Sequence, residues 1–293
     1  MTASAESLLR PTQVVRETAP AKVNLWLEIT GRRADGYHLL DSLVVFADAA
    51  DTLEARAAES FSLDITGPFA PTLRGEPREA NLVSRAVEAF CRVTGRTPAL
   101  SITLTKTLPV AAGLGGGSAD AAATLRLLER LQGTRLPESI RRNLALELGA
   151  DVPACLENRP LHMTGIGEQL ALLPDLPDLQ MLLVNPGVPV STGAIFRLLA
   201  PPWSEAPEHP PGSGDADTLL EVLSKRRNDL EAPACTLAPE IAQTLGALRR
   251  TEGCALARMS GSGATCFAIY RNHGERAQAA EALRQRYPNW WIA

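Results

Sequence analysis

The sequence predicts a protein of two domains that mixes helices and strands, of the α/β or α+β class. Three observations support this prediction. The chain has 293 residues, more than a typical single domain. Apolar residues make up 45% of it, which is enough for a sizeable core. Period-two and helix-like segments are interspersed in both halves. We expect domains at residues 1–173 and 174–293, with 1–12 as a mobile tail.

The first half opens with a strand in AKVNLWLEI, residues 21–29. Apolar residues alternate there, which predicts one core face and one polar face. Lys22 and Asn24 share the polar face, where a lysine is ordinarily a surface residue. Asn81 is expected to cap a helix that Gly95 ends. The remaining elements expected in this half are strands at 39–47, 61–66 and 99–106, a helix from Ser118, and a helix between Pro137 and Gly149.

The second half follows the same mixed pattern after a proline-bearing seam at 173–178. The proline-rich segment 201–214 is expected to be an exposed loop. The elements expected are strands at 179–187, 254–260 and 264–270, and helices at 193–199, 216–224, 239–250 and 274–287.

Composition excludes several classes of protein. The formal net charge of −4 argues against a nucleic-acid or anionic-membrane partner. Five cysteines occur without a C-x-x-C pair, which favours free thiols in a reducing compartment. No signal peptide and no apolar run of about 18 residues is evident. We therefore expect a cytoplasmic protein.

A glycine-rich stretch, GLGGGS (113–118), directly precedes the helix-forming residues 119–131. A flexible linker would not lead into a helix. A dinucleotide fingerprint would need a third glycine where Ser118 stands, and a Walker A loop would need a lysine after Gly117. Glycines before a helix N-terminus can instead direct backbone N–H groups at one anion. An anion cradle is the favoured interpretation, and a tight packing turn remains the alternative.

Three segments together resemble the GHMP kinase superfamily, named after galactokinase, homoserine kinase, mevalonate kinase and phosphomevalonate kinase. They are LPVAAGLGGGSADAA (108–122), APAKVNLWLEITGRRADGYHLLDSL (19–43) and RMSGSGATCFAIY (258–270). The pairing of AKVNL with GRRADGYH is similar to one branch of it. GADVPACL (149–156), GIGEQL (165–170) and RNDLE (227–231) agree with that branch.

The resemblance implies an ATP-dependent small-molecule kinase of isoprenoid precursor biosynthesis. Its substrate would be 4-diphosphocytidyl-2-C-methyl-D-erythritol, phosphorylated on the 2-hydroxyl. The implied α+β fold has an N-terminal ribosomal-protein-S5-domain-2-like domain and a C-terminal ferredoxin-like domain, with the active site in the cleft between them. ATP and Mg²⁺ would be required, with no metal ligand assigned, in a monomer or weak homodimer. A homoserine or mevalonate kinase, or a catalytically silent nucleotide sensor, remains the alternative.

The resemblance also implies roles for individual residues. Asp151 would be the general base and Lys22 would stabilise charge on the transferred phosphoryl group. Without the family, Asp151 reads as an ordinary helix cap. Residues 109–119, which we call the glycine loop, would hold the ATP phosphates: Pro109, Val110, Ala111, Ala112, Gly113, Leu114, Gly115, Gly116, Gly117, Ser118 and Ala119. The predicted substrate-binding residues are Asn24, Tyr37, His38, Thr192, Phe196, Gly261, Ser262 and Gly263.

Two of these assignments have structural alternatives. Phe196 fits the core face of an amphipathic helix as well as a ring that stacks on cytosine. The segment 261–263, which we call the GSG turn, could be a simple hairpin turn or a second anion site. Alanines in the glycine loop restrict positive φ, so we expect a stiff loop.

Overall fold

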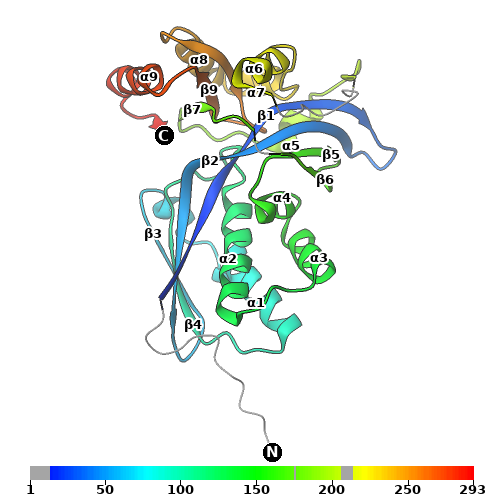
Figure 1. The fold of residues 1–293 in the computed structure, drawn as a ribbon, viewed down its shortest axis with the longest axis vertical. Helices are drawn as coiled ribbons and strands as arrows, with labels where there is room; N and C mark the ends of the chain where they lie inside the picture. Colours follow the sequence, from blue (N-terminus) through cyan, green and yellow to red (C-terminus); the bar gives the residue numbers. More distant parts are fainter. Residues whose placement is uncertain (1–13, 175, 206–213) are drawn as a thin grey trace, which may run out of the picture. The chain divides into compact units, whose positions relative to one another are not determined.

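The computed structural model describes residues 14–174, 176–205 and 214–293, and it combines helices with two sheets, as predicted (Figure 1). The chain forms two compact units that interleave along the sequence. Unit 1 comprises Met1–Ala21, Asp48–Val110 and Gly115–Asn158, and unit 2 comprises Lys22–Ala47, Ala111–Leu114 and Arg159–Ala293. The expected tail 1–12 lies outside the described residues, and the domain boundary at 173/174 stays a prediction.

Unit 1 packs helices against a sheet. Asn81 begins its first helix by accepting the N–H of Val83 at 2.9 Å, and Gly95 ends it at φ 68°, both as predicted. β3 runs parallel to β4, and β4 pairs antiparallel with residues 52–57 of β2. The helices and strands of this unit are α1 (Leu82–Thr94), α2 (Gly116–Gln132), α3 (Glu138–Leu148), α4 (Val152–Glu157), β3 (Ser62–Thr66) and β4 (Leu100–Thr105), with short 3-10 helices at Ala70–Leu73 and Arg78–Ala80.

Two long strands, β1 (Val14–Arg32) and β2 (His38–Ala57), contribute residues to both units. The strand predicted at 21–29 is confirmed, but its polar face does not face solvent. Residues 21–29 are all buried, and Lys22 and Asn24 are only 5% and 1% exposed. A surface lysine is therefore the wrong interpretation of Lys22, because both faces of β1 are covered here.

Unit 2 contains a four-stranded antiparallel sheet in the order β10-β7-β9-β8, on which α8 and α9 pack. Residues 40–44 of β2 pair antiparallel with β5, and β5 pairs with β6. The elements are β5 (Leu161–Gly165), β6 (Gln169–Leu172), β7 (Gln180–Asn185), β8 (Cys254–Met259), β9 (Cys266–Tyr270), β10 (Trp291–Ile292), α5 (Thr192–Arg197), α6 (Ala216–Ser224), α7 (Glu231–Leu237), α8 (Pro239–Arg249) and α9 (His273–Arg286).

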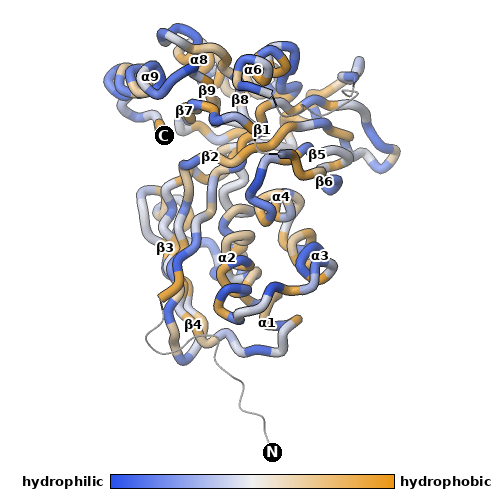
Figure 2. The backbone as a smooth tube through the Cα atoms, viewed as in Figure 1, coloured by the Kyte–Doolittle hydropathy of each residue, from blue (hydrophilic) through white to orange (hydrophobic). Residues whose placement is uncertain are grey.

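The core of unit 2 lies between this sheet and its helices. Figure 2 shows β7 and β9 as mainly hydrophobic tubes, whereas α9 is mainly hydrophilic. α9 buries only Ala279, Ala280 and Leu283, so it covers the sheet with one narrow face. All five cysteines are free, as expected. None of the helices in the described ranges combines the length and apolarity that a membrane crossing needs.

Candidate active site

The glycine loop runs directly into α2, which begins at Gly116 rather than at Ser118. Gly115 is the N-cap at φ 61°, so no side chain caps the helix and Ser118 is its third residue. The first N–H that is paired within the helix is that of Ala119, which donates to the Gly115 carbonyl at 2.8 Å. The N–H groups of Gly116, Gly117 and Ser118 have no acceptor among the described residues. Unpaired donors at the positive end of a helix dipole suit an anion.

Gly113 lies against the GSG turn with no room for a side chain. A Cβ built on Gly113 would lie 2.5 Å from the Ser260 carbonyl oxygen and 2.7 Å from the Gly263 nitrogen. Conversely, a Cβ on Gly261 would lie 2.8 Å from the Gly113 oxygen. The Ser260 hydroxyl also donates to that oxygen at 3.2 Å. Two glycine motifs that are far apart in sequence therefore meet backbone to backbone within unit 2.

The GSG turn connects the antiparallel strands β8 and β9, so it is a hairpin turn, and its contact with Gly113 gives it a further role. The expected stiffness of the alanine-bearing segment stays a prediction, but one of its alanines does adopt positive φ. Ala111 adopts φ 53°, a conformation that an L-residue enters at a cost. The loop therefore does use positive φ at an alanine.

Two predicted residues of β1 contact these motifs. The backbone N–H of Lys22 donates to the Leu114 carbonyl at 2.9 Å. The Asn24 amide donates to the Ser42 hydroxyl at 2.8 Å, and the Asn24 backbone N–H donates to the Ser260 hydroxyl at 3.2 Å. The Asn24 carboxamide oxygen is buried, 3.4 Å from the Cβ position on Gly261, and it has no hydrogen-bond partner in the described part of the chain. A buried unsatisfied acceptor is uncommon, and a donor from a bound ligand would satisfy it.

An aromatic cluster forms around His38 at the start of β2. Its ring centroid lies 5.3 Å from that of Phe196 and 5.7 Å from that of Trp203. The Nε2 atom of His38 is buried and has no hydrogen-bond partner among the residues that the structure describes. Burial, followed by the charge of Arg32, lowers the pKa of His38, which favours the neutral ring. Tyr37 is 61% exposed beside this cluster.

Phe196 fits the core position that its sequence offered, and its stacking on cytosine stays a prediction. It is partly buried against the core of unit 2, and its ring also faces His38. Another pair of predicted residues meets within unit 2, where the hydroxyls of Thr192 and Ser262 lie 2.8 Å apart.

Asp151 directly precedes α4 in unit 1. It occupies the N-cap position, but its side chain makes no capping hydrogen bond. The first turn of α2 is close to this segment, because the Ser118 hydroxyl lies 4.0 Å from a Cβ built on Gly149. Lys22 belongs to unit 2, and the catalytic roles of Lys22 and Asp151 stay predictions.

Several residues that support the site were not predicted. Asn228 donates to the carbonyls of Met259 and Gly261 at 2.8 Å each, and thereby holds the end of β8 and the first residue of the GSG turn. The RNDLE segment was recognised, but its role was not. Trp203 follows a proline pair in a segment that the sequence presents as loop, so nothing in the sequence indicated its contact with His38.

Glu168 also has a structural explanation that the sequence did not provide. Its carboxylate accepts the N–H of Ile166 at 2.6 Å and closes the turn between β5 and β6. A Cβ on Gly165, which has φ 71°, would collide with this carboxylate at 2.6 Å.

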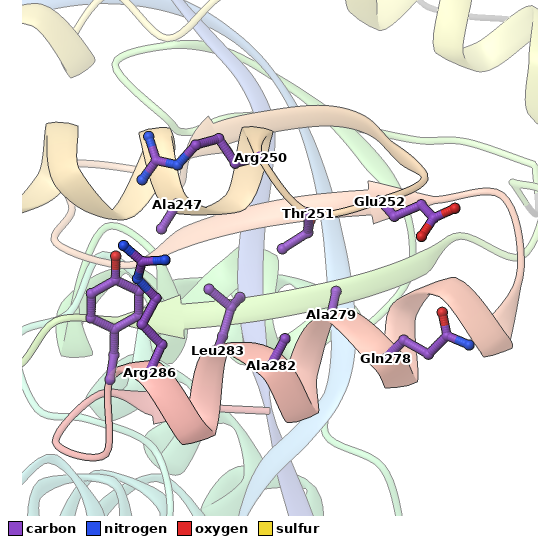
Figure 3. Close-up of a pocket in the computed structure, with 10 residues that line it drawn as sticks. Ala247, Arg250, Thr251, Glu252, Gln278, Ala279, Ala282, Leu283 and Arg286 are labelled. Carbon is purple, nitrogen blue, oxygen red and sulfur yellow. The ribbon is translucent and has the colours of Figure 1, made fainter.

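No cluster of three or more His, Cys, Asp or Glu side chains in the described ranges is arranged to hold a metal ion. A cavity of about 310 Å³ lies between the end of α8 and α9 (Figure 3). Ala247 and Arg250 line one side, and Ala279, Leu283 and Arg286 line the other. None of the predicted site residues lines this cavity.

Comparisons with known proteins agree with the fold and the motifs. Residues 81–159 match the model of the GHMP kinases N terminal domain, and residues 212–289 match that of the GHMP kinases C terminal domain. The chain is 49% identical over 275 residues to 4-diphosphocytidyl-2-C-methyl-D-erythritol kinase of Paramagnetospirillum magneticum, covering 94% of this chain and 95% of that protein. It is 52% identical to the enzyme of the same name from Paracoccus denitrificans, covering 95% of each.

Solved structures extend this comparison. A crystal structure of 4-(cytidine 5'-diphospho)-2C-methyl-D-erythritol kinase is similar with a TM-score of 0.78 at 33% identity, covering 95% of this chain and 98% of that one. A homoserine kinase from Cytophaga hutchinsonii is similar with a TM-score of 0.67 at 18% identity, covering 97% of this chain and 96% of that one. The second match concerns the fold alone.

Proposed function

The chain belongs to the GHMP kinase family and is an ATP-dependent small-molecule kinase, and on this premise we propose that it phosphorylates the 2-hydroxyl of 4-diphosphocytidyl-2-C-methyl-D-erythritol. The observation that carries this proposal is the identity of about half of all residues, over nearly the whole chain, to enzymes of that name. The same reaction assigns the protein to isoprenoid precursor biosynthesis.

The ATP phosphates bind at the start of α2 in this proposal. The unpaired N–H groups of Gly116, Gly117 and Ser118 supply donors, and the helix dipole favours the negative charge. These donors fit a phosphate group without a Walker lysine. Mg²⁺ supplies further charge neutralisation on the phosphates, and no residue is assigned as its ligand.

The transfer step needs a base and a cation. Asp151 accepts the proton of the substrate's 2-hydroxyl. The hydroxyl oxygen then bonds to the γ-phosphorus of ATP, and ADP leaves. Lys22 offsets negative charge that develops on the transferred group. The position of Asp151 at the N-cap of α4, on a segment close to the first turn of α2, supports this role.

The cytosine of the substrate binds at the aromatic cluster in this proposal. Phe196 and the exposed Tyr37 offer ring faces for stacking, and the neutral His38 has a buried nitrogen available for one polar group of the base. The buried Asn24 oxygen, which likewise has no partner among the described residues, accepts a hydrogen bond from a hydroxyl of the sugar-alcohol part. His38 Nε2 and Asn24 Oδ1 therefore support a substrate with polar groups at two places, its base and its sugar-alcohol part.

The test is a coupled assay of ADP release with the diphosphocytidyl substrate, run on wild type, Asp151→Asn and Lys22→Ala. We expect wild-type turnover and a loss of about 100-fold or more in kcat for each variant. Turnover on homoserine or mevalonate, with none on the diphosphocytidyl substrate, would contradict the substrate assignment. ATP binding without turnover on any of the three would instead favour a nucleotide sensor. Near wild-type rates in both variants would contradict the catalytic roles.

A further inference from the structure

A buried cluster of three charged side chains lies beneath the start of α2, and neither the predicted site nor the proposed mechanism uses it. Lys106 follows β4, Asp51 lies on β2 and Asp120 lies on α2, all in unit 1. The Lys106 ammonium contacts the Asp51 carboxylate and lies 2.7 Å from Asp120 Oδ2. The three side chains are 4%, 0% and 5% exposed, respectively.

The charges of the cluster depend on one another. Burial alone would lower the pKa of Lys106, but the carboxylates of Asp120 and Asp51 more than offset it, so the lysine stays charged. Burial raises the pKa of Asp120 to about 7, in spite of the opposing charge of Lys106. The second oxygen of Asp120, Oδ1, is buried, and no described residue forms a hydrogen bond with it.

The cluster contacts the chain at both ends of the glycine loop. On the entry side, Asp51 Oδ1 accepts the backbone N–H groups of Thr107 at 2.6 Å and Leu108 at 2.9 Å, immediately before the loop. On the exit side, Lys106 holds Asp120, the first residue after the loop. A Cβ on Gly116 would lie 3.6 Å from the Lys106 nitrogen, so the helix start rests directly on the cluster.

Stability alone is a weak reason for such a cluster. Burying ions costs free energy that their mutual attraction barely offsets, and apolar side chains of the same shape often stabilise a fold as well or better. An ion cluster does, however, fix distances and directions, since each carboxylate oxygen must face its donor. The contacts here fix the two chain ends that flank the glycine loop.

We propose that Lys106, Asp51 and Asp120 form a positioning clamp that sets the spacing of the two ends of the glycine loop, and thereby aims the N–H groups of Gly116–Ser118 at the ATP phosphates. This inference rests on the proposed function only in taking the glycine loop as the nucleotide site. The clamp residues act through the loop.

The test measures nucleotide affinity directly, by titrating a fluorescent N-methylanthraniloyl derivative of ATP into the full-length protein at about pH 8, where Asp120 is mostly ionised. We expect Asp51→Asn and Asp120→Asn each to raise the Kd for the nucleotide about ten-fold. In the ADP-release assay, the KM for ATP should rise to a similar extent, while the KM for the acceptor changes less than about two-fold.

Glu17→Gln is the matched control. Glu17 lies in the same unit, is 14% exposed on its side chain, and pairs with Arg126 at 3.1 Å and Arg130 at 2.6 Å on α2. The substitution therefore breaks ion pairs to the same helix without changing a contact of the glycine loop. We expect it to lower the urea midpoint but to leave the nucleotide Kd within about two-fold of wild type.

The clamp is overturned if both aspartate variants bind the nucleotide as wild type does, or if Glu17→Gln weakens binding equally. If only Lys106→Met lost nucleotide affinity, Lys106 would contact the nucleotide directly, and this result would also overturn the clamp. If single variants fail to fold, the triple variant Lys106→Met/Asp51→Asn/Asp120→Leu leaves no unpaired buried charge, and tight nucleotide binding by it would refute the clamp.

Hydrogen exchange on the wild-type protein tests the clamp without any substitution. In hydrogen exchange, the amides of Thr107 and Leu108 should be protected without nucleotide, and fast exchange at both would refute the clamp. Failure of the proposed function can be distinguished from failure of the clamp. Nucleotide titration needs no acceptor, so a clamp that behaves as expected in a protein inactive on the diphosphocytidyl substrate would refute only the substrate assignment.

Discussion

Replacing Gly113 by alanine tests whether the glycine loop and the GSG turn depend on backbone-to-backbone contact. The new Cβ would lie 2.5 Å from one carbonyl oxygen and 2.7 Å from one nitrogen, both of which are backbone atoms that cannot rotate away. Gly113 also has φ 74°. Two costs therefore add, one from the backbone conformation and one from the collision.

Gly187→Ala separates these costs, because Gly187 lies in the same unit at φ 79° with nothing within 4 Å of its Cβ position. Both variants incur about 1–2 kcal/mol for a side chain at positive φ, and both reduce the entropy of the unfolded chain equally. Only Gly113→Ala adds the collision, worth about 1–3 kcal/mol by analogy with overpacked sites.

The assay is urea unfolding of both variants, followed by the KM for ATP. We expect Gly113→Ala to lose about 1–3 kcal/mol more than Gly187→Ala, and to raise the KM for ATP because the displaced loop misdirects the N–H groups of α2. If Gly113→Ala were no less stable than Gly187→Ala and kept the wild-type KM, the close contact between the two glycine motifs would be refuted.

Three further predictions concern unit 2. The folded state disfavours the proton on His38, so the free energy of unfolding should fall as pH drops below about 6.5, the ordinary pKa of histidine. In urea titrations over that range, the free energy of unfolding of His38→Gln should fall less than that of wild type. Trp203→Ala should raise the KM for the diphosphocytidyl substrate about ten-fold with little change for ATP, and Trp203→Phe should recover most of it. Asn228→Ala leaves two carbonyls at the GSG turn without their donor, so we expect a loss of about 1–3 kcal/mol by urea unfolding.

Local signals made much of the fold predictable. The helix after Asn81 and its end at Gly95 were predicted correctly because one capping side chain and one left-handed glycine decide both ends. The start of α2 was placed two residues late, because glycines ordinarily indicate a loop. The burial of Lys22 could not be predicted, because it depends on what covers β1 rather than on the alternation within it.

The candidate site was predictable where a motif carried it, and much less where it depended on distant residues. The contact of Thr192 with Ser262 brings together two residues assigned from resemblance. Lys106 is one of only three lysines in the sequence. Its partner Asp51 lies 55 positions away on β2, and no local sequence pattern pairs the two residues. The same holds for Trp203, whose position depends on the path of a loop.

The interleaving of the two units has a consequence for how the chain folds as it leaves the ribosome. Residues Lys22–Ala47 are made early, yet they belong to the unit whose other large segment, Arg159–Ala293, is made last. Leu27 pairs with Asn228, about two hundred positions downstream. The apolar strand at the start of unit 2 must therefore wait through most of synthesis for its partners, which is the period in which aggregation or chaperone binding competes with folding. No single cut in the chain would release both units whole.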